Sequence, residues 1–178
     1  MTIHPPNAAD LERAIRNVPD FPKPGIQFKD ITPVLADARL FNGSIDLLIG
    51  GFKPGDVDAV VGIDARGFIF AAAAAIKLNA GFVPVRKKGK LPYQTYEQSY
   101  DLEYGSATIA MHVDALHPGS RVLLIDDLLA TGGTAAAAIA LVEKLGGKIL
   151  ESTFLIELKF LNGRKRLGGH PVRSIVSY

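Results

Sequence analysis

The chain has 178 residues, of which 48% are hydrophobic and 21% are charged, so it is long enough for one well-buried core and short for two domains. Its 20 basic and 18 acidic residues leave a net charge of only +2, which argues against a nucleic-acid-binding surface. Without cysteine, disulfides and thiolate metal ligands are excluded. We therefore expect one globular domain, residues 1–178, with no nucleic acid as a partner.

Membrane association is not expected either. The most apolar long stretch, residues 67–82, is interrupted by Lys77 and Asn79 after about ten residues, which is too short to cross a bilayer. Residues 1–16 lack an apolar segment of the signal-peptide type. The composition thus predicts a soluble protein.

The expected elements alternate along the chain. Helical spacing first appears in residues 8–17 and 38–52, and prolines punctuate the segment between them. Further on, short apolar runs alternate with helical segments: strands are expected at 59–64, 82–87, 121–126 and 148–158, and helices at 67–79 and 133–145. This alternation predicts an α/β fold with an open, mostly parallel sheet flanked by helices.

The segment between Lys87 and Gly119 departs from this pattern. It is basic, aromatic and polar, and only SATIAMHV, residues 106–113, alternates like a strand. We expect it to form a two-stranded arm or flap with a mobile tip.

The stretch LLIDDLLATGGTAAAA, residues 123–138, carries the clearest chemistry. It places Asp126 and Asp127 at the carboxyl end of an expected parallel strand, where open α/β sheets bind ligands. Small residues and two glycines follow, and they let the backbone point N–H groups at an anion beside the positive end of a helix. These residues, called the phosphate loop below, are Ala130, Thr131, Gly132, Gly133 and Thr134. They predict a phosphate site, although the lysine of a nucleoside-triphosphate P-loop and the dinucleotide pattern G-x-G-x-x-G are both missing.

The acid pair needs its own explanation, because carboxylates repel a neighbouring phosphate. Vicinal ribose hydroxyls are donors that two carboxylates can accept, and positive charge developing on a sugar ring would favour them further. The alternative is that Asp126 and Asp127 only cap the following helix. Capping explains one acid poorly and two acids worse.

The residues VLLIDDLLATGGTAAAA, 122–138, resemble the phosphoribosyl pyrophosphate-binding motif of type I phosphoribosyltransferases. Other blocks are similar, in the same order, to the adenine phosphoribosyltransferases among them: DFPKPGIQFKDITPVL (20–35), GIDARGFIF (62–70), VRKKGKLP (85–92), YDLEYG (100–105) and IELKFLNGR (156–164). The acid-pair motif alone would identify only the superfamily. Its combination with GIDARGF and LEYG is much more specific.

The resemblance implies a type I phosphoribosyltransferase fold with a flexible flap at roughly 88–112 and an N-terminal base-binding hood at roughly 8–36. It also implies a purine salvage enzyme, a cytoplasmic homodimer, that forms AMP and pyrophosphate from adenine and phosphoribosyl pyrophosphate. Magnesium is the implied cofactor, held mainly by substrate and water with no direct protein ligand. The four histidines form no cluster with metal-site spacing, so zinc is not expected.

The resemblance also implies roles for residues around the sugar. The phosphate loop would hold the ribose 5′-phosphate, and Asp126 and Asp127 would engage the ribose hydroxyls. Departure of pyrophosphate leaves positive charge on the ribose and negative charge on the leaving group, so acids and cations are both needed. The implied cations on the pyrophosphate side are Arg66, Arg86, Lys87 and Lys90.

For the purine, the resemblance implies stacking on Phe28, backbone contacts at Gln27 and Lys29, and a pocket lined in part by Leu158. Glu103 and Tyr104 would lie on the flap that closes over the site. Glu103, facing the purine, could accept the proton that leaves the attacking ring nitrogen. The residues expected to act in catalysis are Glu103, Asp126, Asp127 and Arg66.

Plainer interpretations stay open. Glu103 could be a solvated loop acid, RKKGK (86–90) a solvated turn, and Phe28 a core aromatic. At the level of function, the chain could be a phosphoribosyltransferase for another base, such as hypoxanthine, xanthine or orotate. It could also be a non-catalytic regulator that binds phosphoribosyl pyrophosphate or purine, although the stretch before Asp20 is too short for a helix-turn-helix module.

Overall fold

The computed structural model describes residues 4–101 and 105–178. These residues form two compact units, one ending at Leu47 and the other comprising Leu48–Tyr178. The expectation that residues 1–178 form one domain, and the expected bounds of the flap and hood, stay predictions. Among the described residues, no helix is both long and apolar enough to cross a membrane.

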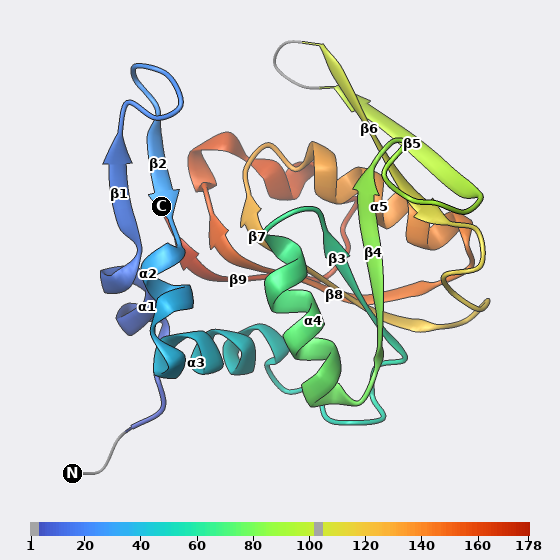
Figure 1. Ribbon diagram of the computed structural model, residues 1–178, viewed down its shortest axis with the longest axis horizontal. Coiled ribbons are helices and arrows are strands. Elements are labelled where there is room, and N and C mark those ends of the chain that lie inside the picture. Colours follow the sequence, from blue (N-terminus) through green and yellow to red (C-terminus); the bar gives the residue numbers. More distant parts are fainter. Residues whose placement is uncertain (1–3, 102–104) are drawn as a thin grey trace. The chain divides into compact units, whose positions relative to one another are not determined.

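The first unit contains most of the N-terminal elements (Figure 1). In chain order these are α1 (Ala8–Ala14), β1 (Arg16–Pro19), β2 (Gln27–Asp30), α2 (Thr32–Ala36) and most of α3 (Ala38–Ile49). Helix α1 begins after Asn7, whose side chain accepts a hydrogen bond from the Asp10 N–H while the Asp10 carboxylate accepts one from the Asn7 N–H.

The helix expected over residues 8–17 was wrong at its end. Ile15 is already extended, and β1 pairs antiparallel with β2, with Arg16 opposite Asp30 and Val18 opposite Phe28. Strand pairing therefore replaces the last helical turn that the spacing predicted.

The second unit is built on a seven-stranded sheet in the order β5-β6-β4-β3-β7-β8-β9, so that β5 and β9 form opposite edges (Figure 1). Strands β4, β3, β7, β8 and β9 are parallel, and β6 and β5 continue the sheet antiparallel. The strand bounds are β3 Ala59–Ile63, β4 Gly81–Lys87, β5 Thr95–Asp101, β6 Ser106–His112, β7 Arg121–Leu129, β8 Lys148–Glu157 and β9 Val172–Ser177. The expected α/β fold with a mostly parallel sheet is confirmed.

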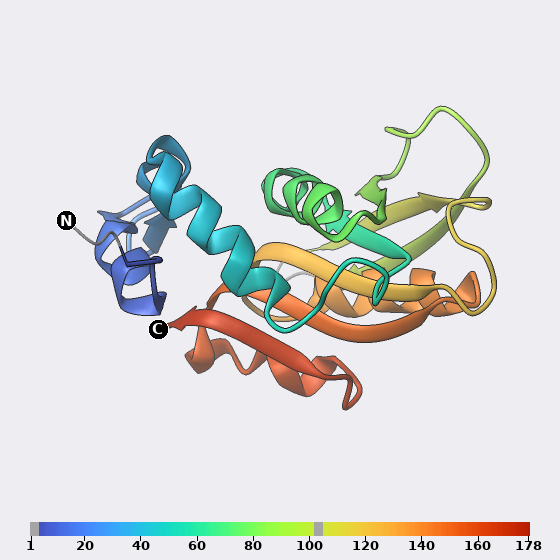
Figure 2. The same ribbon diagram turned by 90° about the horizontal axis from the view of Figure 1, so that it is seen from below.

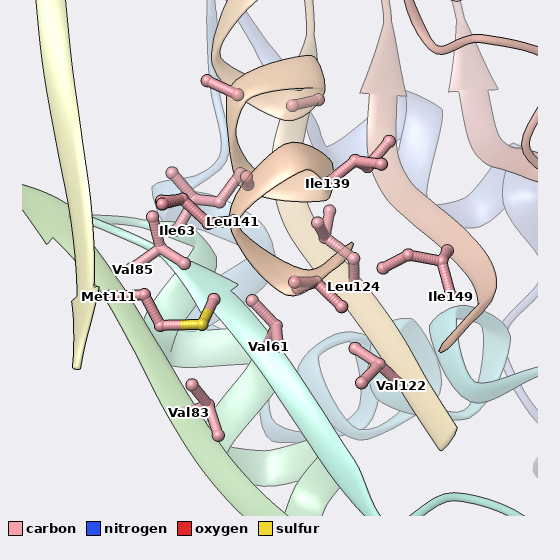
Figure 3. Close-up of a cluster of buried hydrophobic side chains, with 14 of the residues drawn as sticks. Val61, Ile63, Val83, Val85, Met111, Val122, Leu124, Ile139, Leu141 and Ile149 are labelled. Carbon is pink, nitrogen blue, oxygen red and sulfur yellow. The ribbon is translucent and has the colours of Figure 1, made fainter. Parts of the chain in front are cut away.

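Two helices cover opposite faces of this sheet (Figure 2). On one face, α5 (Gly133–Lys144) packs on inward side chains of the strands, including Val61, Val85 and Leu124 (Figure 3). On the other face, α4 (Gly67–Leu78) comes so close that a Cβ on Gly62 would lie 2.6 Å from the Cβ of Ala71. Neighbouring residues of β3 thus point to opposite, fully covered faces, which explains the continuous apolar run.

The segment that departs from the alternating pattern forms the expected two-stranded arm. Strands β5 and β6 pair in register from Thr95 opposite His112 to Asp101 opposite Ser106. Strand β6 also pairs with β4 at Arg86 and Lys87, so the arm extends directly from the sheet. Its tip, residues 102–104, lies outside the described residues.

After β8 the chain makes two short 3-10 helices, η1 (Lys159–Leu161) and η2 (Gly163–Arg166), before returning as β9. Leu167, at the end of η2, is only 2% exposed and belongs to the core that α5 covers. This places residues 162–167 beside the start of α5.

Candidate active site

An open cavity of about 430 Å³ lies at the carboxyl ends of the parallel strands. The turn after β3 forms one wall, β7 a second, and Tyr100 of β5 contributes from the two-stranded arm. The residues that line it are Ile63, Asp64, Ala65, Arg66, Tyr100, Asp126, Asp127, Leu128, Ala130 and Thr134. The structure therefore brings Arg66, both acids and part of the phosphate loop together, although they come from separate elements.

The acid pair does not end its strand as expected. Strand β7 continues to Leu129, with Asp126 opposite Phe154 and Leu128 opposite Ile156 of β8. Pairing with the long strand β8 carries β7 past the acids. The backbone of both acids is consequently held by the sheet rather than by a loop.

The Asp127 carboxylate is buried and forms an ion pair with Arg66. The distance from Arg66 Nε to Asp127 Oδ2 is 2.6 Å, and Asp127 is only 7% exposed. Helix capping is not the function of either acid, because α5 has Gly132 as its N-cap and receives no side-chain capping hydrogen bond. The capping interpretation is therefore wrong.

Asp126 lies in an environment that disfavours its charge. A Cβ on Gly67 would lie 2.5 Å from Asp126 Oδ1, so the start of α4 covers this carboxyl closely and only glycine fits. The Asp127 N–H donates to Asp126 Oδ1 at 2.9 Å. Burial raises the pKa of the Asp126 carboxyl well above its usual value, and the neighbouring charge of Asp127 adds to the rise.

The phosphate loop surrounds a smaller pocket of about 70 Å³. Gly132 adopts a left-handed conformation with φ +83°, and its carbonyl accepts a hydrogen bond from the Ala136 N–H, which starts α5. This sharp turn is one that side-chain-bearing residues adopt only at a cost. The residues around the pocket are Asp126, Leu128, Leu129, Ala130, Thr131, Gly132, Thr134 and Ala135.

With this geometry established, comparisons with known proteins identify the family. Residues 36–172 match the phosphoribosyl transferase domain family. The adenine phosphoribosyltransferase of Acidothermus cellulolyticus is 59% identical over 162 residues, which cover 91% of this chain and 92% of that relative. The chain belongs to the adenine phosphoribosyltransferase family.

Solved structures agree with this assignment. The adenine phosphoribosyltransferase of Rhodothermus marinus superimposes with a TM-score of 0.91 at 56% identity, covering 96% of this chain and 98% of that one. The Saccharomyces cerevisiae enzyme, solved with adenine and an imino-altritol bisphosphate, gives a TM-score of 0.87 at 40% identity, covering 94% and 97%. The predicted type I fold and transferase class are confirmed. A regulator and an enzyme for another base are not favoured.

The other basic residues implied by the family resemblance do not line the larger cavity. Among the described residues, Arg66 lines the larger cavity, whereas Arg86, Lys87 and Lys90 do not. Arg86 approaches it indirectly, since its Nε donates to Asp64 Oδ2 at 3.1 Å and its Nη1 donates to the Lys90 carbonyl at 3.1 Å. The Lys90 N–H donates in turn to the Lys87 carbonyl, which closes the turn.

The residues expected to bind adenine in this family divide between the two units. Gln27, Phe28 and Lys29 lie on β2 of the first unit, where the Phe28 ring meets Phe21 edge-on at 5.1 Å. Leu158 follows β8 in the second unit, and its N–H donates to the Leu129 carbonyl. Glu103 and Tyr104 fall outside the described residues, so their roles stay predictions.

Three contributors to this family site were missed at the sequence level. Asp64 follows the apolar run of β3 and could have been found by the rule that located the acid pair. Gly67 and Tyr100 gave no such signal, because their importance depends on contacts with Asp126 and with the phosphate loop. A Cβ on Gly133, for example, would lie 3.0 Å from the Tyr100 ring.

Proposed function

We propose that this cavity transfers the phosphoribosyl group of phosphoribosyl pyrophosphate to adenine, releasing pyrophosphate and forming AMP. One observation carries the proposal: a phosphate-sized turn, an acid pair and an arginine converge on the same space at the carboxyl end of a parallel sheet.

The sugar phosphate is assigned to the phosphate loop and β7. Backbone N–H groups of Ala130–Thr134, the threonine hydroxyls and the start of α5 suit the ribose 5′-phosphate. Asp126 and Asp127 then face the ribose, where their carboxylates accept hydrogen bonds from vicinal hydroxyls. As pyrophosphate leaves, positive charge grows on the ring, and carboxylates at that position stabilise it.

Pyrophosphate is assigned to the side of Arg66. A guanidinium can hold two phosphate oxygens at once, and it balances the negative charge that develops on the leaving group. Arg86, Lys87 and Lys90 add positive charge nearby, from the same subunit or from a partner subunit. Arg66 is paired with Asp127 in this structure. When substrate binds, two contacts replace this ion pair: Arg66 binds a phosphate oxygen, and Asp127 accepts a hydrogen bond from a ribose hydroxyl.

Adenine is assigned to Phe28, the backbone of Gln27 and Lys29, and Leu158. An aromatic ring gives stacking, and backbone groups read the purine edge. We propose that Glu103, with Tyr104 next to it in the sequence, accepts the proton lost from the attacking nitrogen. Closure of the flap excludes water, which otherwise competes with adenine for the activated sugar.

Magnesium fits the donor set of this cavity, whose lining offers the hard oxygens of Asp64, Asp126 and Asp127. We propose that substrate oxygens and water supply most of its ligands, with the acid pair holding the bound waters. Bound magnesium neutralises the pyrophosphate charge. Among the described residues, no three His, Asp or Glu side chains gather as a dedicated metal site.

We further propose a homodimer acting in the cytoplasm. Helix α4 and strand β4 expose large apolar side chains, with Ile76 82%, Ile69 40% and Phe82 37% exposed. Apolar surface of this kind is typical of subunit interfaces. Light scattering after size-exclusion chromatography should give a mass of about twice 19.0 kDa.

The deciding experiment offers the purified protein magnesium and phosphoribosyl pyrophosphate with adenine, hypoxanthine, guanine or orotate separately. Strong preference for adenine, with AMP and pyrophosphate formed in equal amounts, is the expected outcome. Equal turnover of an oxo-base would contradict the assignment of the base. Binding of the sugar substrate with no nucleotide product would contradict catalysis.

A further inference from the structure

The phosphate loop does not support itself, because Gly132 rests on Gly163, which follows it by 31 residues in the chain. A Cβ on Gly132 would overlap the carbonyl oxygen of Gly163, and a Cβ on Gly163 would overlap the carbonyl oxygen of Ala130. That second Cβ would also lie 3.1 Å from the Gly132 nitrogen. Two glycines therefore meet backbone to backbone, and the turn of the loop is shaped by the position of Gly163.

Gly163 is in turn fixed by the next residue. Arg164 forms a two-pronged ion pair with Glu157 of β8, with Nε to Oε1 and Nη2 to Oε2 both at 2.7 Å. Its Nη1 donates to the Val172 carbonyl at 2.8 Å, and Nη2 also reaches Ser174 Oγ at 3.2 Å, both on β9. One guanidinium thus joins two sheet strands to the segment that carries Gly163.

This ion pair differs from an ordinary surface contact. Glu157 is only 4% exposed, and its carboxylate is held charged because Arg164 donates to it and keeps its pKa below the usual value. Surface ion pairs contribute little to stability and tolerate movement of their side chains. A buried carboxylate that is bound by both prongs of an arginine holds the two side chains in one relative position. Arg164 itself lines neither the larger cavity nor the phosphate pocket.

We propose that Glu157 and Arg164 are positioning residues for the reaction: acting through Gly163, they hold the phosphate loop in the shape that binds the 5′-phosphate. The inference rests on the proposed role of the phosphate loop. The shape of the phosphate loop would then depend on an ion pair whose residues line neither the larger cavity nor the phosphate pocket. The chemistry of the acid pair and of Arg66 is independent of it.

The test compares Arg164→Gln with Arg121→Gln. Arg121 forms a similar two-pronged pair with Asp58, at 3.0 and 2.7 Å, but at the opposite end of β7. Arg164→Gln should weaken binding of phosphoribosyl pyrophosphate by about 10- to 100-fold, because a small displacement of binding groups has an effect of this size. The Kd is measured by calorimetry without adenine. The KM for adenine should stay unchanged. Arg121→Gln should leave both constants unchanged.

A glycine pair tests the same link without removing charge. Gly163→Ala forces its Cβ against the Ala130 carbonyl, whereas Gly51→Ala points its Cβ into space that is open to 4 Å among the described residues. Neither glycine has the left-handed φ that alone would penalise alanine. Only Gly163→Ala should weaken binding of phosphoribosyl pyrophosphate.

Misfolding is separated from mispositioning by the double variant Glu157→Gln/Arg164→Gln, which leaves no unpaired buried carboxylate. The proposal expects its Tm to recover relative to Arg164→Gln while the Kd for phosphoribosyl pyrophosphate stays raised. Recovery of both, or wild-type Kd values in Arg164→Gln and Gly163→Ala, would overturn it. If the wild type binds phosphoribosyl pyrophosphate but forms no AMP, the proposed function fails and the positioning role stands on the Kd values.

Discussion

Two constraints act on Gly132, its left-handed backbone conformation and its close contact with Gly163, and they can be measured separately. Its φ is +83°, and a Cβ there would also overlap the Gly163 carbonyl oxygen. Gly119 has φ +85°, and its Cβ would have open space to 4 Å among the described residues. Gly119→Ala therefore carries the conformational cost alone, and Gly132→Ala carries the same cost plus the overlap.

The magnitudes of the two costs follow from the geometry. Alanine in the left-handed region costs about 1–2 kcal/mol of unfolding free energy in either variant. Forcing a methyl against fixed backbone adds about 1–3 kcal/mol at Gly132 alone. In a chain of this size each kcal/mol lowers Tm by about 2–4 °C, so Gly132→Ala should lose about twice as much Tm as Gly119→Ala.

Thermal denaturation and calorimetric titration with phosphoribosyl pyrophosphate are the assays. Gly119→Ala should bind the substrate as the wild type does, because its site is remote from the cavity lining. Gly132→Ala should bind it at least tenfold more weakly, which corresponds to about 1.4 kcal/mol. Equal losses of Tm in the two variants, with normal binding in both, would refute the close contact between Gly132 and Gly163.

Three further predictions concern charge. Arg66→Gln removes the partner of Asp127 and a cation for the leaving group, so kcat/KM should fall by about 10- to 150-fold in steady-state assays; an unchanged value would remove Arg66 from the site. The raised pKa of Asp126 means that wild-type stability falls as pH rises through that pKa, because the folded state resists ionisation. Asp126→Asn should therefore gain Tm relative to wild type at pH 7 but not at pH 3, while losing activity; a lower Tm at pH 7 would contradict this. At Asp58, hydrogen bonds from Arg121 lower the pKa to about 2 from 3.8, so its stabilisation is present above pH 3.8 and is lost as pH falls through 2. Asp58→Asn should lack that part of the acid-induced fall in Tm, and acid titration curves that match the wild type would contradict it.

The parallel core was predictable because its central strands, β3 and the start of β7, are buried on both faces. Strands β3 and β4 and the start of β7 appear in the sequence as short, continuous apolar runs, and α4 and α5 follow as alanine-rich helices that permit close packing. The position of the acid pair at the carboxyl edge followed from the same pattern. That edge is where the cavity of about 430 Å³ lies.

A two-stranded arm was expected between Lys87 and Gly119, but the position of β5 within it and the existence of β9 were not predictable on these grounds. Strand β5, TYEQSYD, is polar and largely exposed, and it forms because the seven-residue ladder with β6 satisfies its backbone. Strand β9 pairs with β8 after two 3-10 helices, a long-range contact that no local pattern reports. Likewise, the residues that shape the phosphate loop at Gly163 and Arg164 become neighbours only after the sheet is assembled.

The acid pair, Asp126 and Asp127, lowers the stability of the folded chain. Asp126 and Asp127 are adjacent carboxylates, one closely covered by the start of α4 and the other 7% exposed, with Arg66 paired to Asp127. Burying like charges side by side costs free energy, as the raised pKa of Asp126 records. Neither acid caps α5, so helix capping does not offset this cost, and the Arg66 ion pair and the Asp127 N–H offset it only in part. Two carboxylates that are unfavourable in the folded chain but line a cavity become favourable when a ligand adds hydrogen-bond donors and positive charge to those that Arg66 already gives Asp127. Under the proposed function, a ribose that becomes positively charged as its leaving group departs supplies both, which gives a reason for two acids, and not one, beside the phosphate loop.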